Sequence, residues 1–330
     1  MTLDRIVRES LRARIQRRKS GQALRAIFDR TRAIEPSDTL LVSCLRNEMH
    51  RMRFFCDYYR ALGVDRFLFV DNGSTDGFPD WAQGQDDVSV WYTQESYKDA
   101  NFGIDWCNHL LSRYGTGHLC VTVDPDEFLV YPFCATRSLA ELGQHLRDSR
   151  KDSLPALMLD MYGRGRMDET HLADGDNPFE LCPYFDRDGY IQHRSYLQGV
   201  FVRGGPRMRV HNHDNPAHSP ALNKLPVVWW QEHFRYESSM HNLAPHRLNR
   251  PNSKAAISTS GCLFHFKFVA SLAQKIEEER SRKQHYGDGR EYAKYGLSFD
   301  RPLYNAGVSV RYEGPGQLVD LGLMARGDWF

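Results

Sequence analysis

The sequence predicts an α/β protein with a Rossmann-like, mostly parallel sheet flanked by helices, and three observations predict it. Short apolar runs of strand length alternate, over residues 36–135, with stretches that have helical periodicity. Polar clusters directly follow three of these runs, at 46–48, 71–76 and 124–127. Because parallel strands end at one edge of such a sheet, the clusters are expected to meet there, where open α/β sheets bind ligands.

Length and composition are typical of a soluble globular protein. The chain has 330 residues, 41% of them hydrophobic and 26% charged, enough for one large domain or two modest ones. Its net charge of +1 gives no reason to expect nucleic acid as a partner. No apolar run approaches the roughly 18 residues of a membrane span, and arginines interrupt the place of a secretory signal. Seven scattered cysteines indicate reduced core residues and a cytoplasmic location.

Residues 1–35 are expected to form a basic amphipathic helical arm. Residues 1–34 carry ten Lys or Arg and three Asp or Glu, a local charge of +7. Apolar residues recur at helical spacing through the arm: Leu3, Val7, Leu11, Ile15, Leu24, Ile27 and Phe28. A charged helix packed on its own domain would have this pattern. So would a peripheral contact with the anionic inner face of a membrane, where each basic residue adds about 1 kcal/mol.

The remaining elements follow from hydrophobic periodicity and from turn residues. In the first half, strands are expected at 39–45, 66–70, 88–92 and 118–123, and helices at 48–62 and 101–114. In the second half, a helix is expected at 138–147 and strands at 155–162 and 261–268. A long polar segment, 163–195, separates these elements, and a loop of that length is usually functional or disordered. A charged helix over 271–285 and a Gly- and Tyr-rich tail form a C-terminal extension.

Asp124 and Asp126 form the sharpest local feature of the chain. They end a buried β-branched run, and Pro125 fixes the backbone between them. Two oxygen donors this close suit a hard divalent cation, which also holds the phosphates of a substrate. A solvated turn with a helix cap would produce the same pattern, so the neighbouring motifs have to decide between the two interpretations.

Three segments in order resemble the family 2 glycosyltransferases, most closely the branch related to the DUF23 or family 92 enzymes. The segments are VSCLRNE at 42–48, VDNGSTDG at 70–77 and VDPDEFL at 123–129. Each piece alone is weak, but the ordered triple is specific, and the resemblance covers about 36–290. It implies the GT-A fold, with a glycosyltransferase domain over 36–270 that has a nucleotide-binding half (36–135) and an acceptor half (136–270), then a helix and tail over 271–330.

The resemblance also implies an activity, that of a metal-dependent, inverting hexosyltransferase. Such an enzyme moves a sugar from a nucleotide-sugar donor, most simply a UDP-sugar, to a hydroxyl of a glycan or lipid-linked glycan acceptor, as in cell-surface polysaccharide synthesis. Asp124 and Asp126 are then the DXD pair on Mn²⁺ or Mg²⁺ and the donor diphosphate. The other donor-binding candidates are Arg46, Asn47, Glu48, Asp71, Asn72, Ser74, Asp76, Asp105 and Arg207. Turn and cap chemistry would account equally for several of these polar residues.

His265 and Lys267 stand two apart in an otherwise apolar run. In a strand both side chains lie on one face, with three phenylalanines on the other, Phe264, Phe266 and Phe268. A satisfied core histidine is the common alternative, but a buried ammonium without a partner is costly. In the resembled branch this strand returns to the donor site, which implies that His265 is a third metal ligand and Lys267 a phosphate partner.

An inverting transfer needs a base that takes the proton of the acceptor hydroxyl. The candidates in the second half of the chain are His241, Glu232, Glu237 and Asp214, and the residues alone do not choose among them. The resembled branch has a histidine in the same Ser-X-His setting, which favours His241.

Two other functions are compatible with paired carboxylates at the edge of a parallel sheet. A nucleotidyltransferase usually has a Gly-rich basic loop after its first strand, whereas this chain has Arg46-Asn47-Glu48. A catalytically silent nucleotide-sugar-binding protein on the same fold would bind UDP without turnover. The intact Asp124 and Asp126 argue against that second alternative.

Overall fold

The computed structural model of the chain describes residues 19–194, 199–250, 258–273, 275–277, 295 and 301–329. Two predicted segments lie largely outside these residues, namely the basic arm up to residue 18 and most of the charged helix expected over 271–285. The predicted strands at 39–45, 66–70, 88–92, 118–123 and 155–162 and the predicted helices at 48–62 and 138–147 are confirmed to within two residues.

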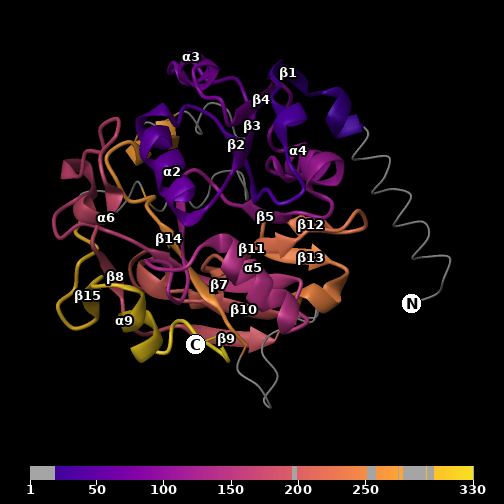
Figure 1. Cartoon of the computed structure of the whole chain (residues 1–330). Coiled ribbons are helices and arrows are strands. Elements are labelled where there is room, and N and C mark those ends of the chain that lie inside the picture. The colour runs from indigo at the N-terminus through magenta and orange to yellow at the C-terminus, as the bar shows by residue number, and fades with distance from the viewer. Residues whose placement is uncertain are drawn as a thin grey trace.

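A nine-stranded sheet with the order β1-β4-β3-β2-β5-β11-β7-β14-β6 runs through the molecule (Figure 1). Its strands are β1 Arg25–Phe28, β2 Leu40–Leu45, β3 Arg66–Asp71, β4 Val88–Tyr92, β5 Leu119–Thr122, β6 Glu127–Val130, β7 Ser153–Asp160, β11 Asn223–Trp229 and β14 Gly261–His265. Three two-stranded sheets accompany it, made of β8 Tyr184–Asp186 with β15 Ser309–Arg311, β9 Ile191–Arg194 with β10 Val200–Arg203, and β12 Arg235–Ser238 with β13 Asn242–Ala244.

Strand directions confirm a mixed α/β architecture with a mostly parallel sheet. Strands β4, β3, β2 and β5 are mutually parallel neighbours, and β14 is parallel to β7. Strand β11 is antiparallel to both β5 and β7, so these two strands run the same way. Strands β1 and β6 are antiparallel to their neighbours β4 and β14. Six of the nine strands therefore run in one direction, and their carboxyl ends share one edge.

Alternate strand residues point to opposite faces of this sheet and belong to two apolar clusters. Helices and short strands cover both faces. Strand β2 contributes Leu41 and Leu45 to the first cluster and Leu40 and Val42 to the second. The first cluster includes side chains of α2 Met49–Leu62, α3 Phe78–Gln83, α5 Leu139–Asp148 and α9 Pro315–Asp320. The second includes side chains of α4 Ile104–Leu110 and of the β12–β13 pair. Each fully buried large side chain contributes roughly 1.5–3 kcal/mol.

Helix α2 fixes the position of the acidic strand end. Its apolar face carries Phe55 and Tyr59, both fully buried, and the helix ends at Gly63, whose φ of 97° is the left-handed conformation that glycine adopts without strain. The Tyr59 hydroxyl donates to the Glu127 carbonyl over 2.9 Å and accepts from the Leu129 N–H over 3.1 Å. The Tyr59 hydroxyl therefore holds β6 at two backbone groups, immediately after the carboxylate pair.

The helical expectation is wrong for the last part of the arm. Residues 25–28 form β1, which pairs with β4. In the described part of the arm, only residues 19–22 are α-helical and Thr31–Ala33 form a 3-10 turn. The physical reason is the free edge of β4, whose backbone groups need partners that a strand can supply. The Arg30 guanidinium holds this edge by donating to the carbonyls of Val88 over 3.0 Å and Gln83 over 2.7 Å.

Two other elements are shorter than expected. Asn101, Phe102 and Gly103 have left-handed φ values of 51°, 56° and 77°, so α4 begins only at Ile104. Strand β14 ends at His265 rather than at 268, because the next residue, Phe266, donates its N–H to the carbonyl of Asp126 over 2.8 Å. Phe268 consequently lies in a different apolar cluster from Phe264 and Phe266, and the predicted aromatic face is wrong at that position.

The second half contains more structure than its polar sequence suggests. The segment 163–195 holds α6 Pro178–Leu181 and the strands β8 and β9. Short 3-10 turns occur in this half at Met167–Glu169, Pro216–His218 and His246–Asn249, and a further one lies in the arm at Thr31–Ala33. The tail wraps back onto the domain through β15, and Trp329 joins the first apolar cluster. Among the described residues, no helix has both the length and the apolar character needed to cross a membrane.

Candidate active site

The polar loops after β2 and β3 form one hydrogen-bonded unit at the carboxyl edge of the sheet. The Arg46 guanidinium donates to the Asn72 carbonyl over 2.7 Å, and the Asn47 N–H donates to Ser74 Oγ over 3.0 Å. In return, the Thr75 N–H donates to Asn47 Oδ1 over 2.8 Å. Four predicted donor-binding residues therefore hold two loops in register, which is itself a reason for their polar side chains.

Asp71 and Asp76 have different tasks in this unit. Asp76 Oδ2 accepts from the Met49 N–H over 2.6 Å and so satisfies the first turn of α2. Asp71 Oδ1 accepts from the Ser74 N–H over 2.8 Å, but its fully buried Oδ2 has no hydrogen-bond partner among the described residues. Burial raises the pKa of Asp71. A buried acceptor without a donor is costly, so Asp71 offers a place for a donor group of a ligand.

The third polar loop meets the second one around the end of β2. Cys44, the penultimate residue of β2, has a pKa well above its usual range because of burial and then because of the nearby Cys107, Asp124 and Asp71. The carboxylates of two different loops therefore act on one thiol. Strand β2 pairs in parallel with both β3 and β5, so their carboxyl ends lie side by side, which confirms the expectation that the polar clusters after β3 and β5 meet at one edge.

Beside Asp124 lies an ion pair that the sequence did not suggest. Lys224 Nζ is 2.9 Å from Glu127 Oε1 and 3.5 Å from Asp124 Oδ2, and the Asp124 N–H donates to Glu127 Oε2 over 3.1 Å. The Glu127 and Lys224 side chains are only 1% and 4% exposed, whereas that of Asp124 is 42% exposed. Burial raises the pKa of Glu127 to about 7 despite the opposing ammonium. Burial lowers the pKa of Lys224, but Glu127 and Asp124 outweigh it and the net shift is upward.

Asp126 belongs to a second buried chain of charges. His265 Nε2 lies 3.4 Å from Asp126 Oδ2, and His265 Nδ1 lies 2.7 Å from Asp160 Oδ1. The other oxygen of Asp160 accepts from Arg207 Nε over 2.7 Å. Burial raises the pKa of Asp126, but the imidazole outweighs burial and the pKa falls well below its usual range. In the same way, Arg207 and His265 hold the pKa of Asp160 at about 2, and the two carboxylates raise that of His265.

This geometry fits a metal site that is completed by its ligand. A carboxylate can only accept, so both ring nitrogens of His265 carry protons here, Nδ1 toward Asp160 and Nε2 toward Asp126. A cation bound by Asp126 would take the place of the Nε2 proton, while Asp160 would keep Nδ1 protonated. Metal-binding histidines are commonly oriented by such a carboxylate. Asp126 and His265 thus offer two donors, and Asp124 is close to Lys224 instead. Among the residues that the structure describes, no group of three or more His, Cys, Asp or Glu is arranged to hold a metal, so phosphate oxygens and water would complete the coordination.

Two predicted donor-binding residues are engaged elsewhere. Glu48 forms a buried ion pair with Arg51 over 2.9 Å and a second with Lys275. The charges of Lys275 and Arg51 also lower the pKa of Asp126, so this cluster borders the carboxylate pair. The ammonium of Lys267, by contrast, lies 5.2 Å from the ring centroid of Tyr295. With β14 ending at His265, the predicted alternation that put His265 and Lys267 on one face does not extend to Lys267.

Asp105 and Asn101 lie beside the same edge through α4. Asp105 stands in the first turn of the helix, and its charge, together with that of Asp124, adds to the raised pKa of the buried Cys107. Asn101 Nδ2 donates to the Glu237 carbonyl over 3.1 Å and so joins the turn before α4 to β12.

Of the four predicted bases, His241 is the one that neighbours these charges. Its Nδ1 lies 2.6 Å from the Asn223 carbonyl oxygen, which can only accept, so Nδ1 carries the proton and Nε2 is an acceptor. Burial, and after it the positive charges of Lys224 and Arg207, lower the pKa of His241 to about 3. The imidazole is therefore neutral at physiological pH.

The other three predicted bases have surface partners. Glu237 accepts from Arg235 over 3.0 Å and lies 2.8 Å from His246 Nε2. Asp214 is 81% exposed and lies 3.2 Å from His213, and Glu232 is exposed. None of these contacts involves the Asp124 or Asp126 loop.

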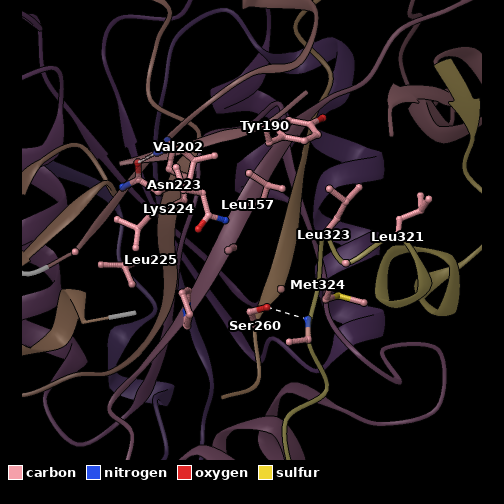
Figure 2. A pocket seen from close by; sticks show the side chains of 18 of the residues that line it. Leu157, Tyr190, Val202, Asn223, Lys224, Leu225, Ser260, Leu321, Leu323 and Met324 are labelled. Atoms are coloured by element: carbon pink, nitrogen blue, oxygen red, sulfur yellow. Dashed lines mark hydrogen bonds between the residues drawn. The ribbon is translucent and has the colours of Figure 1, made fainter. Parts of the chain in front are cut away.

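A pocket of about 560 Å³ adjoins this centre and is lined by both Lys224 and His241 (Figure 2). The pocket follows the edges of β7, β11 and β14, and a wall of it comes from residues 321–325 near the end of the chain. Sequence reasoning missed Glu127, Asp160, Lys224 and this wall. The sequence does contain a signal for Lys224, because this lysine, like Lys267, stands in an otherwise apolar run.

No protein-family model matches the chain, and no curated protein matches it. The likeness to glycosyltransferases therefore rests on the three sequence motifs.

Proposed function

We propose that this chain is a metal-dependent glycosyltransferase of the GT-A fold, which transfers a sugar with inversion from a nucleotide-sugar donor to a hydroxyl acceptor. The observation that carries the proposal is the Asp126–His265 pair, 3.4 Å apart and backed by Asp160, at the edge where β2, β3 and β5 end. A mixed carboxylate and imidazole donor set suits Mn²⁺ or Mg²⁺. The same edge supplies loops of the kind that hold nucleotides in open α/β sheets.

The nucleoside of the donor would occupy the unit formed by the loops after β2 and β3. Asp71 supports this role, because its buried Oδ2 has no partner among the described residues and would accept from a ribose hydroxyl or a base N–H. The hydrogen bonds of Asn47, Ser74 and Asp76 would hold the loops in shape for that contact. A UDP-sugar is the first donor to test.

Asp126 and His265 would hold the cation, which when bound stabilises the charge that develops on the leaving diphosphate. Asp160 would keep the His265 imidazole turned toward that site, and Arg207 would keep Asp160 ionised. Arg207 therefore acts through Asp160 in this proposal and leaves direct phosphate contact to other groups. Lys224 adds positive charge beside Asp124.

His241 would accept the proton of the acceptor hydroxyl at Nε2. Its neutral state supports this role, and its position beside Lys224 is better than those of Glu232, Glu237 and Asp214. A pKa of about 3 makes the free imidazole a weak base, and the negative charge of a bound diphosphate would make it stronger.

The decisive experiment measures binding of UDP to the full chain by calorimetry and thermal shift, with Mn²⁺ and with EDTA. UDP at 100 times its dissociation constant should stabilise the protein by about 2.7 kcal/mol, and only when Mn²⁺ is present. Asp126→Asn should abolish this binding. Asp57→Asn, on a carboxylate of α2 that is 74% exposed, is the control and should bind as the wild type does.

Turnover separates the remaining candidates. Release of UDP from a UDP-sugar in the presence of Mn²⁺ supports glycosyl transfer, and release of pyrophosphate from a nucleoside triphosphate would indicate a nucleotidyltransferase. UDP binding with no turnover of any donor sugar would indicate a silent binding protein. Full UDP binding in excess EDTA would contradict the metal role of Asp126 and His265.

A further inference from the structure

The pocket beside the candidate centre has a mixed polar and aliphatic lining. Figure 2 shows its lining side chains, which come from several strands and from the end of the chain. A polar end contains Asn223, Lys224 and His241, with Val202 and Leu225 beside them. The aliphatic side chains of Leu157, Leu321, Leu323 and Met324 line the pocket toward the chain end, and the rest of the lining also includes the polar residues Arg187, Asp188, Gln192, Asn249 and Ser260. A volume of about 560 Å³ lies within the range of pockets that hold drug-sized ligands, roughly 300–1,000 Å³.

The aliphatic wall is a built part of the fold. Ser260 and Ala325 exchange two hydrogen bonds of 2.9 and 3.0 Å, and Cys262 Sγ donates to the Leu323 carbonyl over 3.5 Å. These contacts hold residues 321–325 against the first residues of β14. The Ser260–Ala325 contact appears at the lower edge of the pocket in Figure 2.

One exposed apolar side chain belongs to the pocket. Leu321 lines the pocket and is 36% exposed, so the chain end places an aliphatic side chain at its surface. Leu181 is also 36% exposed but does not line the pocket. The aliphatic residues of the lining favour a ligand with an aliphatic part.

The polar end of the pocket shares two residues, Lys224 and His241, with the candidate centre. Lys224, which lines it, is the ammonium that lies within 3.5 Å of both Asp124 and Glu127. His241, which also lines it, keeps Nε2 as an acceptor because Nδ1 donates to Asn223. A hydroxyl bound at this end would therefore lie next to the candidate base and beside the carboxylate loop.

We propose that this pocket is the acceptor site and that it takes an amphiphilic acceptor, a sugar or alcohol hydroxyl carried on an aliphatic chain. The inference rests on the proposed glycosyl transfer and names its acceptor class. The hydroxyl end lies at Lys224 and His241, and the chain lies along Leu157, Leu323 and Leu321. In the transfer, the acceptor oxygen bonds to the anomeric carbon, the anomeric C–O bond breaks with its electron pair going to the diphosphate, and the hydroxyl proton goes to His241 Nε2.

The test compares two probes, methyl β-glucoside and octyl β-glucoside below its micelle concentration, by calorimetry on the full chain. The octyl compound should bind at least tenfold more tightly than the methyl compound, since the chain covers apolar surface. Leu321→Asn and Leu323→Asn should each remove at least fivefold of the octyl affinity and leave the Mn²⁺-dependent binding of UDP unchanged. Leu181→Asn is the matched control, because Leu181 is also 36% exposed but lies outside the pocket, and it should bind the octyl probe as the wild type does.

Five outcomes would overturn the inference. Equal affinity for the two probes would show that the pocket does not bind the aliphatic chain. The same conclusion would follow if neither pocket variant changed the octyl affinity, or if Leu181→Asn weakened it equally. Leu321→Asn alters an exposed side chain, so it keeps the test valid even if Leu323→Asn does not fold. If the octyl probe binds at the pocket while UDP binds nowhere, the acceptor role fails together with glycosyl transfer. If UDP binds and is turned over without any effect of chain length, the acceptor inference alone fails.

Discussion

Lys224 and Glu127 form an ion pair of 2.9 Å that is almost completely buried, and the same ammonium lies 3.5 Å from Asp124. The pair joins β11, in the middle of the sheet, to the first residue of β6, next to the Asp-X-Asp motif. One side of the carboxylate pair is therefore held by a positive charge of the protein itself, and the other by His265.

Lys224→Met should destabilise the fold by about 3–5 kcal/mol, because it leaves the buried Glu127 without its partner. The double variant Lys224→Met/Glu127→Gln removes both charges and should be more stable than the single variant. Urea denaturation of the wild type, both single variants and the double variant gives the coupling between the two residues. Additive losses would mean that the pair is not coupled.

Asp160→Asn should lower the affinity for Mn²⁺, although Asp160 is not itself a proposed ligand of the cation. The neutral asparagine amide accepts a weaker hydrogen bond from His265 Nδ1–H than the charged carboxylate does. Loss of such an orienting carboxylate usually reduces metal affinity 10- to 100-fold. The measurement is the affinity for Mn²⁺ in the presence of saturating UDP, followed by electron paramagnetic resonance. Asp57→Asn is again the control, and unchanged Mn²⁺ affinity in Asp160→Asn would show that His265 is not a ligand.

Two half-buried histidines, His50 and His241, should make the protein less stable in mild acid. Burial, and then nearby positive charge, lowers the pKa of His241 and of His50 to about 3, whereas an unfolded histidine titrates near 6.5. As the pH falls below 6.5, the unfolded state takes up a proton that the folded state refuses, so stability drops. Between pH 7 and pH 5 the loss is at most about 2 kcal/mol for each histidine. His241→Gln and His50→Gln should each flatten this dependence in urea denaturation, and a slope that neither variant changes would refute the assignment.

Gly103→Ala should destabilise the protein by about 2–4 kcal/mol. A Cβ there would lie 2.8 Å from Tyr97 Cε2 and 2.9 Å from Cys44 Sγ in β2, and the φ of 77° is unfavourable for alanine. Gly77→Ala is the matched control, since Gly77 has a φ of 84° but nothing within 4 Å of its added Cβ. The control should lose only about 1 kcal/mol, and equal losses would show that the close approach to Cys44 has no cost.

Truncation of the N-terminus should separate two roles of the arm. Removing residues 1–28 takes away β1 and exposes the edge of β4, so the melting temperature should fall. Removing only residues 1–18 takes away six Lys or Arg and two Asp or Glu, and should weaken binding to anionic liposomes while leaving β1 in place. Unchanged liposome binding after the shorter truncation would contradict the membrane role.

Much of the parallel part of the fold could be predicted because its signals are local. An apolar run such as 39–45 followed directly by polar residues marks both a buried strand and the end of that strand. The parallel βαβ arrangement then brings the loops at Asp71 and Asp124 to one edge, as the pairing of β2 with both β3 and β5 confirms. The helical prediction for residues 25–28 failed because it was based on periodicity alone, and a free sheet edge overrode that periodicity.

The sequence by itself determined which residues end the parallel strands, and hence the Asp124 and Asp126 edge. Only the tertiary structure decided what faces those carboxylates. Lys224 and Lys267 carry the same signal, a lysine in an apolar run, yet Lys224 reaches Glu127 whereas Lys267 lies over Tyr295. The difference arises because β11 is placed between β5 and β7, and because β14 ends at His265 where Phe266 bonds to Asp126. Pairings between residues about 100 positions apart depend on strand order and register, and local sequence patterns do not encode either.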